Sequence, residues 1–124
     1  ELNPSIETSL IIFLTSFDDF NEYLSLLDEG NEVIDIMGYS GVFQLASFHP
    51  DYCFEGVLPS DPENYTNRSP WPMLHVIREA SMTRVLEQYP NPELIPENNI
   101  RCAINKGTHY FQQTLMSIWQ KAQP

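Results

Sequence analysis

The first half of the chain lacks positive charge. Of the six Lys and Arg residues in the 124-residue sequence, none precedes Arg68, whereas 13 of the 17 Asp and Glu residues do. The net charge at pH 7 is −11, and a surface of this charge repels nucleic acid and anionic membranes. We therefore expect neither as a partner. The acidic half is either a solvated face or a surface for a basic partner.

Cysteines, long apolar runs and nucleotide fingerprints are also scarce. The two cysteines, Cys53 and Cys102, form no CxxC motif and are too few for a disulfide framework. The apolar run Leu10–Leu14 is too short to cross a bilayer. The motifs GxGxxG, GxxxxGK[ST] and GxSxG are absent. We expect a soluble domain without a cofactor in a reducing, cytoplasmic compartment.

Two apolar segments flank an amphipathic one near the start of the chain. Ser9–Thr15 and Gly41–Phe48 are rich in β-branched and aromatic residues, which predicts two buried strands. Between them, apolar residues recur at helical spacing from a Ser16 N-cap to a Gly38 C-cap. Strand, helix and strand with short connections predict a βαβ unit with parallel strands.

The second half begins with a loop, His49–Pro72, that is longer than an ordinary connection. Its four aromatic residues argue against disorder. A helix is predicted from about Pro72 to Gln88, and Glu97–Ala122 is predicted as one helix broken near Gly107, or as two.

The predicted fold class is α/β, with a small, largely parallel sheet, a long ordered loop and C-terminal helices. We expect one domain over residues 1–124, with a core at 6–100 and a helical tail at 97–122. Because the sequence starts with Glu1 rather than Met, we expect the C-terminal part of a longer chain.

Basic and polar residues gather where the loop meets the predicted helix. The carboxyl ends of parallel strands and the N-terminus of a helix both favour ligands. Arginine suits carboxylate and phosphate groups, and histidine titrates near neutral pH. The pattern predicts an anion site with two catalytic histidines, His49 and His75, and four binding residues, Arg68, Arg78, Asn67 and Ser69. In the alternative interpretation, the two arginines pin the loop by pairing with Asp51, Asp61 or Glu79.

A metal site is a weaker alternative. His75 and Glu79 are four residues apart, so a helix would place them on one face. His49 and Asp51 would complete a mixed nitrogen and oxygen ligand set. This spacing is much less specific than HExxH, and a hydrogen-bonded histidine or a side-chain pair on a helix is the favoured explanation.

Three stretches carry a resemblance to a known family. ASFHPDYCFEG, PENYTNRSPWPMLHVIREAS and IPENNI resemble signature stretches of a bacterial family of unknown function, the one numbered 1415. The resemblance covers most of residues 6–100 and implies no established activity. It also implies that full-length relatives carry an N-terminal segment with a Cys-Pro-Phe motif, which this sequence does not contain.

Two hypotheses of function remain open. In the first, the chain binds a small phosphorylated or carboxylated metabolite, with or without turning it over. In the second, it is a non-catalytic protein-interaction domain or a domain that self-associates through its C-terminal helix, where LMSIWQ would supply an apolar face.

Overall fold

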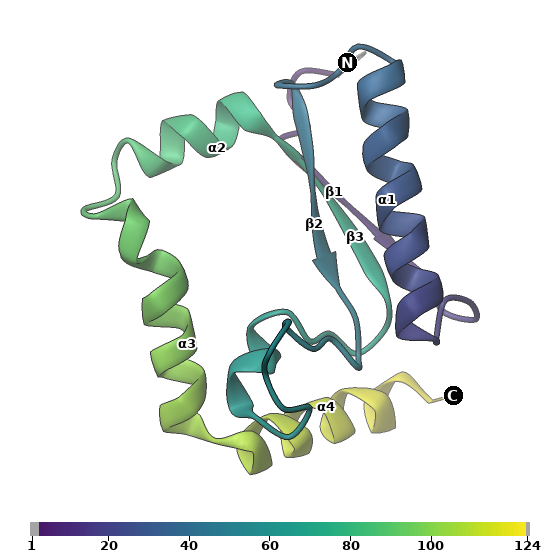
Figure 1. Cartoon of the computed structure of the whole chain (residues 1–124), viewed down its shortest axis with the longest axis vertical. Coiled ribbons are helices and arrows are strands. Elements are labelled where there is room, and N and C mark those ends of the chain that lie inside the picture. The colour runs from purple at the N-terminus through teal and green to yellow at the C-terminus, as the bar shows by residue number, and fades with distance from the viewer. Residues whose placement is uncertain (1–2, 124) are drawn as a thin grey trace.

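In the computed structural model, which describes residues 3–123, a small sheet, the long loop and a series of helices are arranged in a ring (Figure 1). None of the helices among these residues is long and apolar enough to cross a membrane. In chain order the elements are β1 (Thr8–Ile12), α1 (Phe20–Ile36), β2 (Phe43–Phe48), the 3-10 helix η1 (Pro62–Thr66), β3 (Met73–Arg78), α2 (Glu79–Leu86), the 3-10 helix η2 (Pro92–Leu94), α3 (Ile95–Lys106) and α4 (Thr108–Ala122).

The sheet has the strand order β1-β3-β2, and β3 is antiparallel to both of its neighbours. The expected α/β class is confirmed, but the expectation of a largely parallel sheet is wrong. β1 and β2 run in the same direction, as a βαβ unit requires, yet they do not pair with each other. The chain returns after the long loop and inserts β3 between them.

β3 corrects a second prediction, because its residues were expected to be helical. Met73–Arg78 is apolar on both sides of the chain, a pattern that a central strand shares with a buried helix. Pairing with β1 and β2 satisfies the backbone of this segment on both edges. The helix therefore begins only at Glu79 and ends at Leu86.

α1 is capped by Asp19, whose carboxylate accepts hydrogen bonds from the backbone N–H groups of Asn21 and Glu22, both at 3.0 Å. The predicted cap at Ser16 is therefore wrong by three residues. Gly38 follows the helix with φ +73°, as predicted for its C-terminus. The predicted break in the C-terminal helix is confirmed at Gly107, which separates α3 from α4.

α1 lies very close to the sheet. A Cβ atom added at Gly30 would come within 2.8 Å of the Leu45 Cδ1 atom of β2. The glycine thus permits close packing in a helix that continues unbroken through it. The apolar side chains that point from the sheet toward α1 are Ile11, Phe43, Leu45, Leu74 and Val76.

The opposite face of the sheet is not covered by a helix lying across it. Figure 1 shows α2, α3 and α4 extending away from the sheet and returning toward the loop, with no element crossing the face opposite α1. Strand alternation places a set of mainly apolar side chains on this uncovered face: Thr8, Leu10, Ile12, Gln44, Ala46, Phe48, Met73, His75 and Ile77.

The hydrophobic core is correspondingly small. Among the described residues, the buried hydrophobic side chains that form the core are Tyr23, Leu74 and Ala103. The accessible surface is 8590 Å², about 1,800 Å² above the roughly 6,800 Å² typical of a monomer of this mass. The fold therefore leaves much more surface in water than its size requires.

Tyr23 joins α1 to the ends of β2 and β3. Its side chain is 0% exposed. The hydroxyl donates to the Met73 carbonyl at 2.6 Å and accepts from the Phe48 N–H at 2.9 Å. Phe48 and Met73 lie opposite each other in the register, so the phenol bridges the last rung of the ladder. Burial raises the pKa of Tyr23 from 10.0 to about 12, against the opposing effect of the Phe48 hydrogen bond.

We expect Tyr23→Phe to lower the free energy of unfolding by about 1–3 kcal/mol, because two buried backbone groups lose their partner. Chemical denaturation at neutral pH measures this loss. Tyr89→Phe is the control, since Tyr89 is 52% exposed. Its free energy of unfolding should equal that of the wild type. A Tyr23→Phe variant as stable as that control would show that the bridge contributes nothing.

The same variant should change the stability at alkaline pH. The folded chain holds the Tyr23 proton more tightly than the unfolded chain does. This contribution is complete below pH 10 and is lost as the pH rises from 10 toward 12. Unfolding measured across that range should show a decline in the wild type that is smaller in Tyr23→Phe.

Candidate functional site

His49 is buried at the start of the long loop and is saturated with hydrogen bonds. Its Nε2 donates to the Phe17 carbonyl at 2.9 Å, and its Nδ1 accepts from the Asp51 N–H at 3.0 Å. Its side chain is 0% exposed. Phe17 has φ 63°, a left-handed backbone that is rare for an aromatic residue. His49 thus holds a strained turn before α1, and neither ring nitrogen is free for a ligand.

Three polar side chains tie the loop to its own backbone and to β2. Asn64 is 0% exposed, accepts from the Phe54 N–H at 3.0 Å and donates to the Leu58 carbonyl at 2.8 Å. Asn67 donates to the Ser47 carbonyl at 3.1 Å, and Ser69 donates to the Trp71 carbonyl. These side chains act as internal supports of the loop.

Arg68 serves the same loop. Its Nε donates to the Tyr52 carbonyl at 3.0 Å and its Nη2 donates to the Pro59 carbonyl at 2.8 Å. The guanidinium lies over the Tyr65 ring, 4.7 Å from the centroid. Arginine does pin the loop, as one interpretation of the sequence held, but it does so through carbonyl groups rather than carboxylates.

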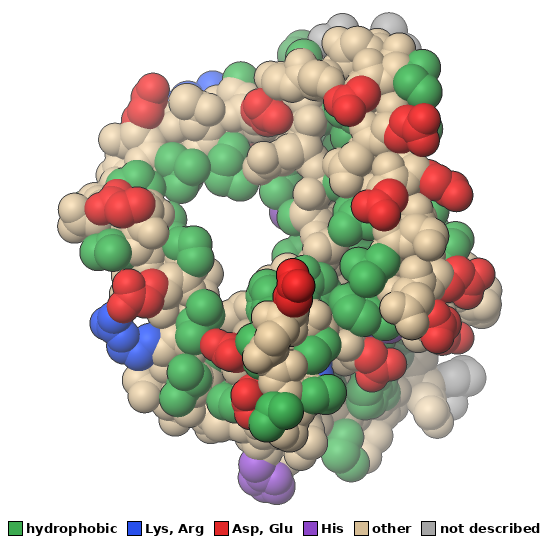
Figure 2. All heavy atoms as spheres, in the orientation of Figure 1, with side chains coloured by type: hydrophobic (Ala, Val, Ile, Leu, Met, Phe, Trp, Pro, Cys, Tyr) green, Lys and Arg blue, Asp and Glu red, His purple; other side chains and the backbone are tan. Residues whose placement is uncertain are grey.

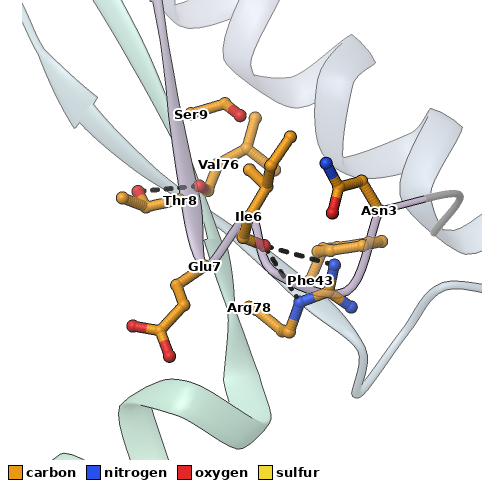
Figure 3. A pocket seen from close by; sticks show the side chains of 8 residues that line it. All are labelled: Asn3, Ile6, Glu7, Thr8, Ser9, Phe43, Val76 and Arg78. Atoms are coloured by element: carbon orange, nitrogen blue, oxygen red, sulfur yellow. Dashed lines mark hydrogen bonds between the residues drawn. The ribbon is translucent and has the colours of Figure 1, made fainter.

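Arg78 lies at the far end of β3, on the α1 side of the sheet, beside a surface cleft of about 390 Å³ (Figure 3). Its Nε and Nη2 donate to the Ile6 carbonyl, both at 3.3 Å, and the guanidinium lies over the Phe43 ring. Within residues 3–123, Nη1 has no hydrogen-bond partner. Ser9, whose side chain lies on the same face as Arg78, also lines the cleft.

His75 lies in the middle of β3 on the uncovered face. Thr8 Oγ1 donates to the Val76 carbonyl at 3.1 Å and is also hydrogen-bonded to His75 Nε2. Which atom donates in this second bond depends on the tautomer of His75. The other ring nitrogen, Nδ1, has no hydrogen-bond partner among the described residues.

An apolar groove runs beside His75, between the uncovered face and α2. Its volume is about 250 Å³. We call it the His75 groove, and its lining residues are Glu7, Thr8, His75, Ile77, Ser81, Met82 and Val85. Glu7 is held at the rim by an ion pair with Arg84 at 2.8 Å.

The six residues of the predicted anion site therefore do not converge. His75 and Arg78 project from opposite faces of the sheet. Arg68 and Ser69 bond to carbonyl groups of the loop, and Asn67 bonds to the Ser47 carbonyl of β2. The predicted helix N-terminus at Pro72 is the start of a strand. The proposed metal set, His49, Asp51, His75 and Glu79, is not brought together either: no cluster of three or more His, Cys, Asp or Glu that could hold an ion occurs in residues 3–123.

Sequence reasoning missed most of the His75 groove. Thr8, Met82 and Val85 carry no motif, and their proximity to His75 depends on the order of the strands and on where α2 starts. Alternation along β3 could have paired His75 with Ile77 on one face. No sequence signal indicated that β1 lies next to β3.

The family model described as "Protein of unknown function (DUF1415)" matches residues 1–113. The chain belongs to this family. No curated protein and no solved structure matches the chain.

Within this DUF1415 chain, the stretches that carried the resemblance have two different structural tasks. ASFHPDYCFEG and PENYTNRSPWP supply His49, Asn64 and Arg68, which hold the loop together. MLHVIREAS supplies β3 and the start of α2, including His75 in the groove. The loop thus acts as a rigid support for the strand that carries His75.

We expect Asn64→Ala to lower the free energy of unfolding of this DUF1415 chain by about 1–3 kcal/mol, because the buried Asn64 amide is the partner of the Phe54 N–H and the Leu58 carbonyl. It should also speed proteolysis within residues 52–60. Asn98→Ala, on the exposed side of α3, is the control and should stay within about 0.5 kcal/mol of the wild type. Equal stability of both variants would contradict a supporting role for Asn64.

Proposed function

We propose that this chain is a binding domain that takes an apolar polypeptide segment, with basic flanks, against the uncovered face of its sheet and the His75 groove. The observation that carries the proposal is the one-sided cover of the sheet. A sheet face of mainly apolar residues requires another layer to exclude water from it. Among residues 3–123, α1 supplies that layer on the opposite face alone.

The surface around the sheet supports this proposal. In Figure 2 an opening passes between the sheet, the loop, α2 and α3, and hydrophobic side chains line much of its rim. Val85 of α2 and Ile104 of α3 are 58% and 54% exposed. Contiguous apolar surface of this kind is typical of interaction sites.

Charge indicates the chemistry of the partner. The chain carries −11, and Figure 2 shows acidic side chains distributed around the outside of the opening. A segment with lysine or arginine beside its apolar residues would be attracted by this field, and one with acidic flanks would be repelled. The His75 imidazole and the Glu7 carboxylate are polar groups within the groove, and the carboxylate can accept a hydrogen bond from a basic side chain.

A designed amphipathic peptide of leucine and lysine tests this function. We expect it to bind the wild-type chain in fluorescence anisotropy, and Val85→Glu to weaken binding at least tenfold by placing a charge in the apolar groove. Val33→Glu is the matched control, because Val33 is 52% exposed on α1 and lies outside the groove. It should bind as the wild type does.

Two further peptides separate the apolar contribution to binding from the electrostatic one. Replacing leucine by serine should abolish binding, and replacing lysine by glutamate should weaken it in a manner that salt relieves. Equal affinity for all three peptides, or equal binding by Val85→Glu and Val33→Glu, would contradict the proposal.

A second candidate function is binding of a small phosphorylated or carboxylated molecule in the cleft beside Arg78. The observation that favours it is the Nη1 of Arg78, which has no hydrogen-bond partner among residues 3–123 and belongs to the cleft together with Ser9. A guanidinium and a hydroxyl group suit an oxyanion. Within residues 3–123, this is the part of the predicted anion site that retains a free donor.

Inorganic phosphate and citrate are suitable probes for that cleft. A ligand present at a hundred times its Kd should add about 2.7 kcal/mol to the free energy of unfolding, visible as a higher melting temperature. Arg78→Gln should remove the shift, and Arg101→Gln should keep it, since Arg101 lies in an exposed pair with Glu97 on α3. A shift that survives Arg78→Gln would exclude this cleft as its source.

A further inference from the structure

β1 forms one edge of the sheet, and its outer side has no backbone partner within residues 3–123. The Phe13 N–H donates to the Pro72 carbonyl, and the Arg78 N–H donates to the Glu7 carbonyl. Odd-numbered residues of this strand thus turn their polar groups toward β3. Because these directions alternate along a strand, Thr8, Leu10 and Ile12 turn their N–H and C=O groups outward.

The edge carries none of the features by which proteins usually prevent strand pairing. No charged residue and no proline occurs from Thr8 to Phe17, and β1 is a continuous strand without a bulge. All five of its residues are exposed. Leu10, Ile11 and Ile12 are 56%, 46% and 45% exposed, respectively.

We propose that two copies of this chain associate through β1, as an antiparallel pair centred on Leu10, and form one continuous six-stranded sheet. In this register Leu10 lies opposite the partner's Leu10, and Thr8 lies opposite the partner's Ile12. Each β1 then donates the outward N–H groups of Thr8, Leu10 and Ile12 and accepts at the same three carbonyl groups. The edge is its own complement under a two-fold axis, as an isologous interface requires.

Side-chain chemistry also favours a second copy over a basic partner. On the uncovered face, Leu10 would meet the partner's Leu10 at the short separation of cross-strand pairs. On the α1 face, Ser9 would meet the partner's Ile11. The strand itself offers no carboxylate to a cationic ligand, whereas its apolar side chains on both faces suit an identical strand.

The exposed area is sufficient for such an interface. A stable association buries about 800 Å² per partner, and the chain exposes about 1,800 Å² more than a monomer of its mass typically does. The excess therefore accommodates both an edge pairing and an occupant of the His75 groove. Both proposals involve the side chains of Thr8, Leu10 and Ile12 on the uncovered face, but the edge pairing rests on the outward backbone groups of β1 and the groove proposal rests on the apolar lining beside His75, so neither depends on the other.

Charge-swap variants at Leu10 test the register by sedimentation velocity. We expect the wild type to be a dimer at micromolar to millimolar concentration, more so at high salt, because two copies of charge −11 repel. Leu10→Lys and Leu10→Asp should each be monomeric, since like charges would lie opposite each other. An equimolar mixture of the two should restore a dimer.

Leu58→Lys is the matched control, because Leu58 is 66% exposed in the loop, and it should dimerise as the wild type does. Circular dichroism confirms folding of each variant. In hydrogen exchange, the Thr8, Leu10 and Ile12 amides should become protected as concentration rises. A monomeric wild type, a dimer that survives Leu10→Lys, or a mixture that stays monomeric would overturn the proposal, as would protection of these amides at all concentrations.

Discussion

The fold depends on one hydroxyl group, that of Tyr23. It reaches from α1 into the end of the sheet and joins the Phe48 N–H to the Met73 carbonyl. The ring also lies 5.0 Å from the ring of His49, which holds the turn before α1. One side chain therefore connects the helix, the last residue of β2, the first residue of β3 and the start of the loop. A buried polar bridge of this kind tolerates few alternatives, because each group it satisfies would otherwise lack a partner in a dry environment.

Local patterns in the sequence predicted those helices and strands whose type depends on neighbouring residues in the chain. The stripe of α1, the apolar segments of β1 and β2, and the break at Gly107 all occur close to their expected positions. Met73–Arg78 was assigned incorrectly because an apolar run fits both a helix and a central strand. What decides between them is pairing with β1, which lies more than 60 residues earlier in the sequence. Such pairing leaves no trace in the periodicity of the segment itself.

The site shows the same division between local and distant information. Polar residues concentrated in one loop predicted a ligand, but most of them bond to carbonyl groups of that loop, as Asn64 and Arg68 do. A long irregular segment has many backbone groups to satisfy, and polar side chains are the usual means. His75 was chosen from the sequence by its type and position, and its functional role stays a prediction. Its surroundings, Thr8 and Val85, follow from strand order and from the start of α2, and neither was readable from the sequence.

The insertion of β3 explains why so much apolar surface remains. If β1 paired directly with β2, the single helix between them would lie over both strands, as in an ordinary parallel unit. With β3 in the middle, β1 is displaced by one strand from β2, against which α1 packs closely at Gly30. Ile11 points toward the α1 side and is still 46% exposed. The same displacement leaves the outer N–H groups of β1 unpaired. The exposed edge, the open face and the small core thus share one cause, the order of three strands.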